Sequence, residues 1–143
     1  LRANYLKEFV YMRCMNQDTI ATAQLIEQEV DQLNQQLHII DENLRELHAL
    51  KESLEDLESP SAKEIMVNIG KRVFIPVEIK EKKLLIDVGK NNFLKKTIPQ
   101  TQELINEQIN RLMTGKTQMM VRLRDLEKEM EQLIKKLEAG QKS

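Results

Sequence analysis

The sequence is poor in the residues that build compact cores and tight turns. Its 143 residues include no Trp, three Phe, two Tyr, four Gly, three Pro and one Cys. So few rings and turn residues disfavour a small globular core and favour long regular elements packed by aliphatic side chains. A single thiol, Cys14, cannot form an intramolecular disulfide, so nothing indicates a disulfide-rich secreted domain.

Long apolar runs and a strong net charge are also missing. No run of about 18 apolar residues occurs, so no transmembrane helix is predicted. Charged residues interrupt positions 1–15, which argues against a signal peptide and favours a cytoplasmic protein. The net charge of −1 argues against a general nucleic-acid or membrane binder. The charge is unevenly placed, however: residues 15–62 hold two basic and eleven acidic side chains, whereas residues 63–96 hold nine and four.

Two stretches carry apolar residues in a heptad pattern, which indicates a coiled coil. In the first, both seam positions of each heptad are apolar from Ala23 to Leu47, after which the stripe moves to Leu50, Leu54 and Leu57. The second runs from Ile105 to Leu137 in alternating steps of four and three, with Lys116 as its polar member. The predicted seam consists of Val30, Leu33, Leu37, Ile40, Leu44, Leu47, Ile109, Leu112, Met119, Leu123, Leu126 and Met130.

Between these stretches the apolar period changes to two, which is typical of β-strands. Apolar residues alternate through 65–69, 73–79 and 84–88, and Gly residues punctuate the longer runs. The pattern predicts about four short strands in two hairpins, with Lys80–Lys83 as a polar hairpin tip. Pro76 has no N–H, so its strand is expected to be an edge strand or to bulge there.

These elements predict an α+β fold in which a long antiparallel coiled coil carries two β-hairpins at one end. The expected divisions are a first helix over 1–59, a hairpin oligomerisation region over 60–98 and a second helix over 99–143. Isolated hairpins with apolar residues on both faces are not stable, so we expect hairpins from several subunits to close into a barrel or sandwich. The residues expected in this assembly are Val67, Ile69, Val73, Phe74, Ile75, Val77, Ile86, Val88 and Phe93.

The two predicted helices differ in length, which leaves residues 1–16 as an unpaired tip. Three of the five aromatic residues lie in this stretch, and rings with Met side chains suit adaptable apolar contacts. We therefore expect a surface that binds apolar clients, although the same residues could continue the heptad and pack on a neighbour, or be an extension foreign to the natural protein. The candidate client-binding residues are Tyr5, Phe9, Met12, Leu133, Ile134 and Leu137.

No pattern in the sequence predicts catalysis. His38 and His48 occupy non-seam helix positions, and no Cys/His cluster has zinc spacing. Gly115-Lys116-Thr117 lacks the upstream glycine of a phosphate-binding loop. The clustered lysines of residues 80–96 lack interleaved aromatics, and lysines on strand edges also prevent unwanted pairing. We therefore expect no enzyme activity, no cofactor, no metal and no nucleic-acid partner.

The order of these motifs resembles the prefoldin family. A helix precedes Ile65–Gly70, a hairpin, Leu85–Gly89, Phe93–Lys96 and a second helix, and two hairpins are the mark of the alpha class. The resemblance covers about residues 15–140, and an archaeal alpha subunit fits best. It implies an ATP-independent chaperone with two alpha and four beta subunits, whose hairpins form double barrels. It also implies that the coiled-coil tips hold unfolded proteins and pass them to a group II chaperonin.

A second interpretation remains beside this one. The chain could be a prefoldin-like adaptor, a coiled-coil scaffold in a larger assembly without general client holding. The chemistry of the tip separates the two, because an adaptor needs one specific partner and a chaperone tolerates many.

Overall fold

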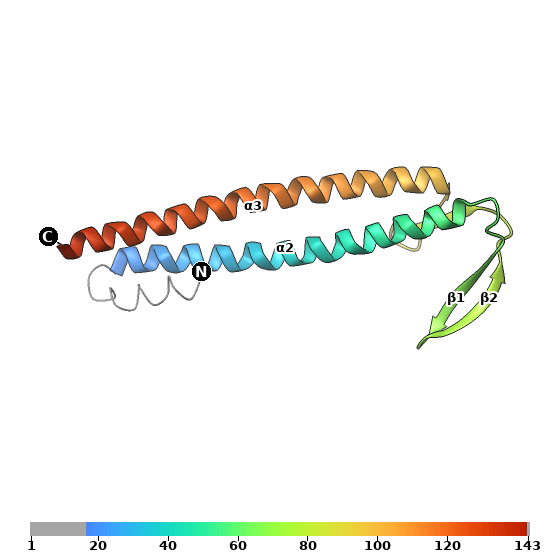
Figure 1. Ribbon diagram of the computed structural model, residues 1–143, viewed down its shortest axis with the longest axis horizontal. Helices are drawn as coiled ribbons and strands as arrows, with labels where there is room; N and C mark the ends of the chain where they lie inside the picture. The colour runs from blue at the N-terminus through green and yellow to red at the C-terminus, as the bar shows by residue number, and fades with distance from the viewer. Residues whose placement is uncertain (1–16, 143) are drawn as a thin grey trace. The chain divides into compact units, whose positions relative to one another are not determined.

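The computed structural model describes residues 17–142 as two long helices with four strands between them (Figure 1). The predicted α+β class, a coiled coil with two hairpins, is confirmed. Within this part, residues 17–41 and 113–142 form one compact unit, here called the helical unit, and residues 42–112 form a second, the hairpin unit. The elements are α2 (Gln17–Glu58), β1 (Glu64–Gly70), β2 (Val73–Glu78), β3 (Lys83–Asp87), β4 (Phe93–Thr97) and α3 (Ile98–Lys142).

The helical unit is an antiparallel pair of helix segments with an apolar seam. The beginning of α2 packs against the later part of α3, and Leu126 is fully buried in the seam. Ile20, Val30, Leu33 and Leu133 pack against the buried cluster from its edges. The heptad spacing places these side chains on one face of each helix, so the packing follows from the sequence pattern. The buried cluster consists of Ala23, Ile26, Leu126, Met130, Ile134 and Leu137.

The hairpin unit has a smaller core at the ends of the helices nearest the strands. Leu54, Ile98 and Ile105 are buried there, and Leu84 of β3 packs against them. Leu50, predicted as the next stripe member after Leu47, is instead 45% exposed, while Leu54 is 2% exposed. Leu54 is thus buried as predicted, and the prediction was wrong for Leu50, because Leu54 lies one full heptad after Leu47 and the seam keeps its original phase.

The strands form two separate two-stranded antiparallel sheets, β1–β2 and β3–β4. Val67 lies opposite Ile75 in the first, and Leu85 lies opposite Lys95 in the second. The prediction of a hairpin tip at Lys80–Lys83 was wrong, because this polar segment leads from the first hairpin to β3. Its Lys82 Nζ donates a hydrogen bond to the Ser59 carbonyl, 2.5 Å away, beyond the last turn of α2.

The two hairpins turn in the same way. Each has two consecutive residues with positive φ at the tip, as a type I′ turn requires. A glycine with positive φ precedes them, and its N–H donates to a side-chain oxygen two residues earlier at 2.8 Å. The sequences Asn68-Ile69-Gly70-Lys71-Arg72 and Asp87-Val88-Gly89-Lys90-Asn91 therefore have equivalent roles.

A reciprocal capping box starts α3 directly after β4. The Thr97 N–H donates to Gln100 Oε1 at 3.1 Å, and the Gln100 N–H donates to Thr97 Oγ1 at 3.3 Å. Each bond satisfies a backbone donor that the first turn of a helix leaves without an internal acceptor. Pro99 lies inside this first turn, where its missing N–H removes no helical bond. The capping box therefore explains how a strand passes into a helix without a loop.

Candidate assembly surface

The strands expose most of their apolar side chains. None of the strand residues is buried, and the exposed fraction of Leu85 reaches 70%. Of the residues predicted to assemble, Val77 and Ile86 are half-buried. The others are between 38% and 66% exposed: Val67, Ile69, Val73, Phe74, Ile75, Val88 and Phe93. So many exposed apolar side chains in one short segment mark a contact surface, and their role in assembly stays a prediction.

The strands also present free backbone edges. The Ile79 N–H donates to the Lys63 carbonyl at 2.8 Å. In an antiparallel pair, every second residue directs its backbone N–H and C=O toward the partner strand. Ile75 and Val77 therefore direct these groups toward β1, as Ile79 does, and the backbone of residue 76 points away from β1. Pro76 therefore sits where its missing N–H breaks no bond within the hairpin. Pro76 was expected to lie on an edge strand or at a bulge. It lies on an edge strand, and the bulge is between Asn68 and Gly70.

An apolar groove runs beside the strands within the hairpin unit. Its volume is about 470 Å³, and Leu50 of α2, Leu85 of β3 and Leu104 of α3 line it while being 41–70% exposed. Leu85, although part of the family motif, was not among the residues predicted to assemble, and Leu104 was not predicted at all. Leu104 lies beside the seam residue Ile105 in an otherwise polar stretch, and this is the signal that could have found it.

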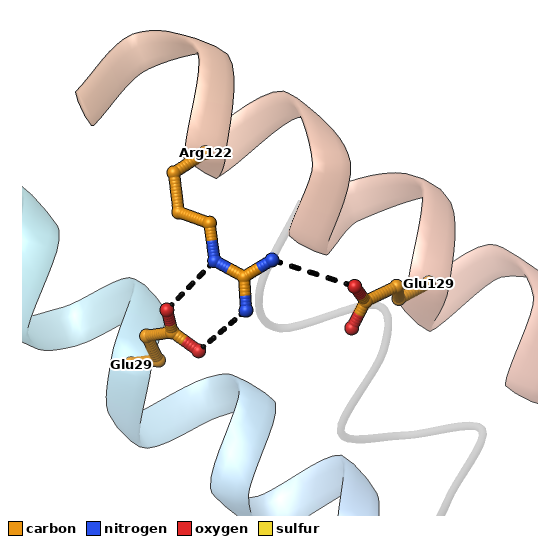
Figure 2. Close-up of polar contacts among 3 residues, drawn as sticks. All are labelled: Glu29, Arg122 and Glu129. Carbon is orange, nitrogen blue, oxygen red and sulfur yellow. Dashed lines mark hydrogen bonds and ion pairs between the residues drawn. The ribbon is translucent and has the colours of Figure 1, made fainter. Parts of the chain in front are cut away.

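Ion pairs across the helical unit flank the seam. Arg122 Nε and Nη2 donate to the two carboxylate oxygens of Glu29 at 2.8 and 3.0 Å, and Nη1 lies 3.5 Å from Glu129 Oε1 (Figure 2). This hydrogen-bonded guanidinium lowers the pKa of Glu29 below its usual range, and Glu29 in turn raises the pKa of Arg122. Bidentate geometry fixes the relative position of the two side chains, although exposed pairs stabilise a fold only weakly.

Lys116, the polar member of the second stripe, pairs across the helices. Its Nζ lies 2.6 Å from Asp41 Oδ1, with the two side chains 32% and 45% exposed. A charged residue in a seam position favours the register that brings it to its counterion. The pair therefore accounts for a lysine in an otherwise apolar stripe.

The predicted client-binding residues divide into two groups. Tyr5, Phe9 and Met12 lie outside the described residues. Leu133 is half-buried, and Ile134 and Leu137 are 8% and 6% exposed because they pack in the seam. The structure places these last two in the seam at the end of the helical unit, and their role in client binding stays a prediction. None of the twelve predicted seam residues is exposed.

The described residues hold no arrangement typical of a metal site. Within residues 17–142, no three His, Cys, Asp or Glu side chains come together as a metal would require. In the same range, neither helix has a stretch apolar enough to cross a membrane.

Comparison with known proteins identifies the family. A profile of the Prefoldin family, described as "Prefoldin subunit", matches residues 26–143. The search of curated proteins gives no match. Among solved structures, the chain is similar to a chain in the cryo-EM structure of filamentous PFD from Methanocaldococcus jannaschii, with a TM-score of 0.68 and 17% identity. The alignment covers 85% of this chain and 99% of that one. With two hairpins between two antiparallel helices, the chain belongs to the prefoldin family, as an alpha-class subunit.

Proposed function

We propose that this chain is a subunit of an ATP-independent chaperone complex that acts in the cytoplasm. One observation supports this most strongly: a helix pair with a buried seam is joined to strands that leave most of their apolar side chains exposed in the described part of the chain. A two-stranded sheet is marginally stable by itself, and strands from further subunits would stabilise both sheets. Assembly through them would leave the opposite helix ends free to bind other proteins. The partners would be beta-class subunits, four of them with two alpha subunits.

The proposed clients are unfolded proteins, held at the end of the helical unit. Leu133, Ile134 and Leu137 lie in the last turns of α3 whose side chains are described, and helix ends open at low free-energy cost. Opening would expose a row of apolar side chains, to which Tyr5, Phe9 and Met12 would add rings and a thioether. Several subunits holding one client would gain affinity through multivalency. The held client would then be transferred to a group II chaperonin.

Suppression of aggregation tests this function. The assembled complex should keep a chemically denatured test protein soluble, equally well with and without ATP. Deleting residues 1–16 should preserve the mass of the complex and weaken this protection severalfold, because the deletion removes three of the apolar contacts. Replacing Gln17 and Gln24 with Ser serves as a control that alters exposed polar positions of α2.

The adaptor interpretation predicts a different outcome. A complex of correct mass that protects no test protein, with or without residues 1–16, would overturn the chaperone proposal and favour a scaffold with one specific partner. Protection that persists in the deletion variant would place the client surface elsewhere in the complex.

A further inference from the structure

The segment that joins the two hairpins contacts both of them. Residues 79–82, here called the strap, follow β2 and lead directly into β3. At the start of the strap, the Ile79 N–H donates to the Lys63 carbonyl at 2.8 Å and closes the base of the first hairpin. Glu81 forms an ion pair with Lys95 of β4, in the second hairpin. The strap therefore touches each hairpin at a separate point.

A third contact ties the strap to the end of α2. Lys82 Nζ donates to the Ser59 carbonyl, which also accepts the Ala62 N–H at 3.0 Å. The last turn of α2 contains no basic residue, although the carbonyl groups at a helix C-terminus favour a nearby cation. Lys82 supplies this cation from the strap.

The first hairpin has no apolar anchor on the helices. In the second hairpin, Leu84 packs against the buried Leu54, Ile98 and Ile105, so apolar side chains attach this hairpin to α2 and α3. Neither buried cluster in the described part of the chain contains a residue of β1 or β2, and no side chain of these strands packs against one. The polar contacts of the strap are therefore left to hold the first hairpin beside the second.

We propose that the strap fixes the first hairpin relative to the second, with Glu81 and Lys82 as its positioning residues. The proposal rests on the proposed function in taking the hairpins as the assembly surface, and it adds how that surface is prepared. Two hairpins held at a fixed spacing can engage other subunits together, so the second contact forms at a high effective concentration. Holding the hairpins in place before assembly also reduces the entropy lost on binding.

The charges around the strap support this role. The hydrogen bond and the charge of Lys95 lower the pKa of Glu81, and the nearby charge of Lys83 acts in the same direction. The Lys95 and Glu81 side chains are 53% and 54% exposed, and a single ion pair of this kind stabilises a fold only weakly. We therefore expect each contact to have a small effect by itself and the two together to have a measurable one.

Spin labels on the lone chain measure the position of one hairpin relative to the other. In a Cys14→Ser background, Met66→Cys in β1 and Val88→Cys after β3 offer exposed labelling positions outside the strap. Dilution with unlabelled chain suppresses distances between molecules. Pulsed electron paramagnetic resonance should give a narrow distance distribution for the parent, and combined Glu81→Gln and Lys82→Met substitutions should broaden it severalfold.

Matched variants separate the strap from a general loss of charge or of folding. Lys82→Arg keeps a cation at the end of α2 and should keep the narrow distribution, as should Lys80→Met, at an exposed position of the same segment. Glu81→Lys and Lys95→Glu should each broaden the distribution, because each places like charges together. The two combined restore an attractive pair and should restore the narrow distribution, whereas a second substitution would not repair a folding defect.

Assembly with partner subunits gives the functional readout. Light-scattering titration should show that the Glu81→Gln, Lys82→Met chain assembles about threefold or more weakly than the parent. The chain with the reversed pair, Glu81→Lys and Lys95→Glu, should assemble like the parent. Circular dichroism should show equal helix content in all of these chains, since none of the substituted side chains lies in a buried cluster.

The proposal is overturned if the Glu81→Gln, Lys82→Met chain gives the distance distribution of the parent. It is also overturned if this chain has a broadened distribution and still assembles as tightly as the parent. A parent chain that assembles with no partner subunit would contradict the proposed function instead, and the distances in the lone chain would still show whether the strap positions the hairpins.

Discussion

The helical unit and the strands use apolar side chains in opposite ways. In the helical unit, the apolar stripes of α2 and α3 cover each other, and Leu126 has no exposed surface. In the strands, Phe74 and Leu85 are 51% and 70% exposed, although the strand pattern is as regular as the helical one. The helix pair is thus complete within one chain, while each sheet stops at two strands. We therefore expect one part of the chain to fold by itself and the other part to be completed by other subunits.

The largest expected effect comes from a charge on the strand surface. Phe74→Asp should abolish assembly with partner subunits, because a carboxylate would be buried in the contact without a counterion. The helix content of the lone chain should not change, since Phe74 is half exposed and packs in neither core. Light scattering and circular dichroism measure the two quantities. Lys80→Asp, an exposed position between the hairpins, is the control and should assemble like the parent.

A substitution in the helical seam should instead affect the stability of the helix pair. Leu126→Ala should destabilise the helix pair by about 2–5 kcal/mol, because it removes a fully buried side chain and leaves a cavity. Leu25→Ala, at a position 65% exposed, should change the unfolding free energy by less than about 0.5 kcal/mol. Chemical denaturation followed by circular dichroism compares the two. Equal effects of both substitutions would mean that the seam does not stabilise the helices.

The smallest effect concerns the ion pair beside the seam. Because the pKa of Glu29 is lower in the folded chain than in the unfolded chain, its ion pair stabilises the fold at pH values above the unfolded pKa. This stabilisation is lost as the pH falls through the folded pKa. Glu29→Gln should therefore lower the melting temperature slightly at neutral pH and not at all in strong acid. High salt should shrink the difference further. Glu131→Gln, an exposed position on α3, is the control for loss of a surface charge.

The sequence predicted the helices better than the hairpins for a physical reason. A heptad stripe repeats over many residues, so one misplaced residue such as Leu50 leaves the rest of the seam in phase. A hairpin depends on two turn residues, and here Lys71 and Arg72 adopt positive φ without being Gly or Asn. The breaks predicted at Gly70 and Gly89 lie at the real turns, whereas the polar segment Lys80–Lys83 had turn composition as well and was wrongly predicted as a hairpin tip.

Other features could not be predicted from the sequence because they depend on contacts distant in the chain. The pairing of Arg122 with Glu29 needs the register of the two helices, and several other charged pairs were equally possible from spacing alone. The direction of each backbone N–H along β3 needs the ladder phase, which one hydrogen bond at Val88 sets. The burial of Ile134, which lies outside the predicted stripe that ends at Leu137, likewise required the length over which α2 covers α3.

Hydrogen exchange in the assembled complex and in the unassembled Phe74→Asp chain tests the central claim most directly. Backbone amides in the buried stretches of α2 and α3 should exchange slowly in both samples. Outward-pointing amides of the strands, such as that of Leu85, should exchange fast in the unassembled chain and slowly in the complex. Strand amides that are equally protected in both samples would contradict the claim that other subunits complete these sheets.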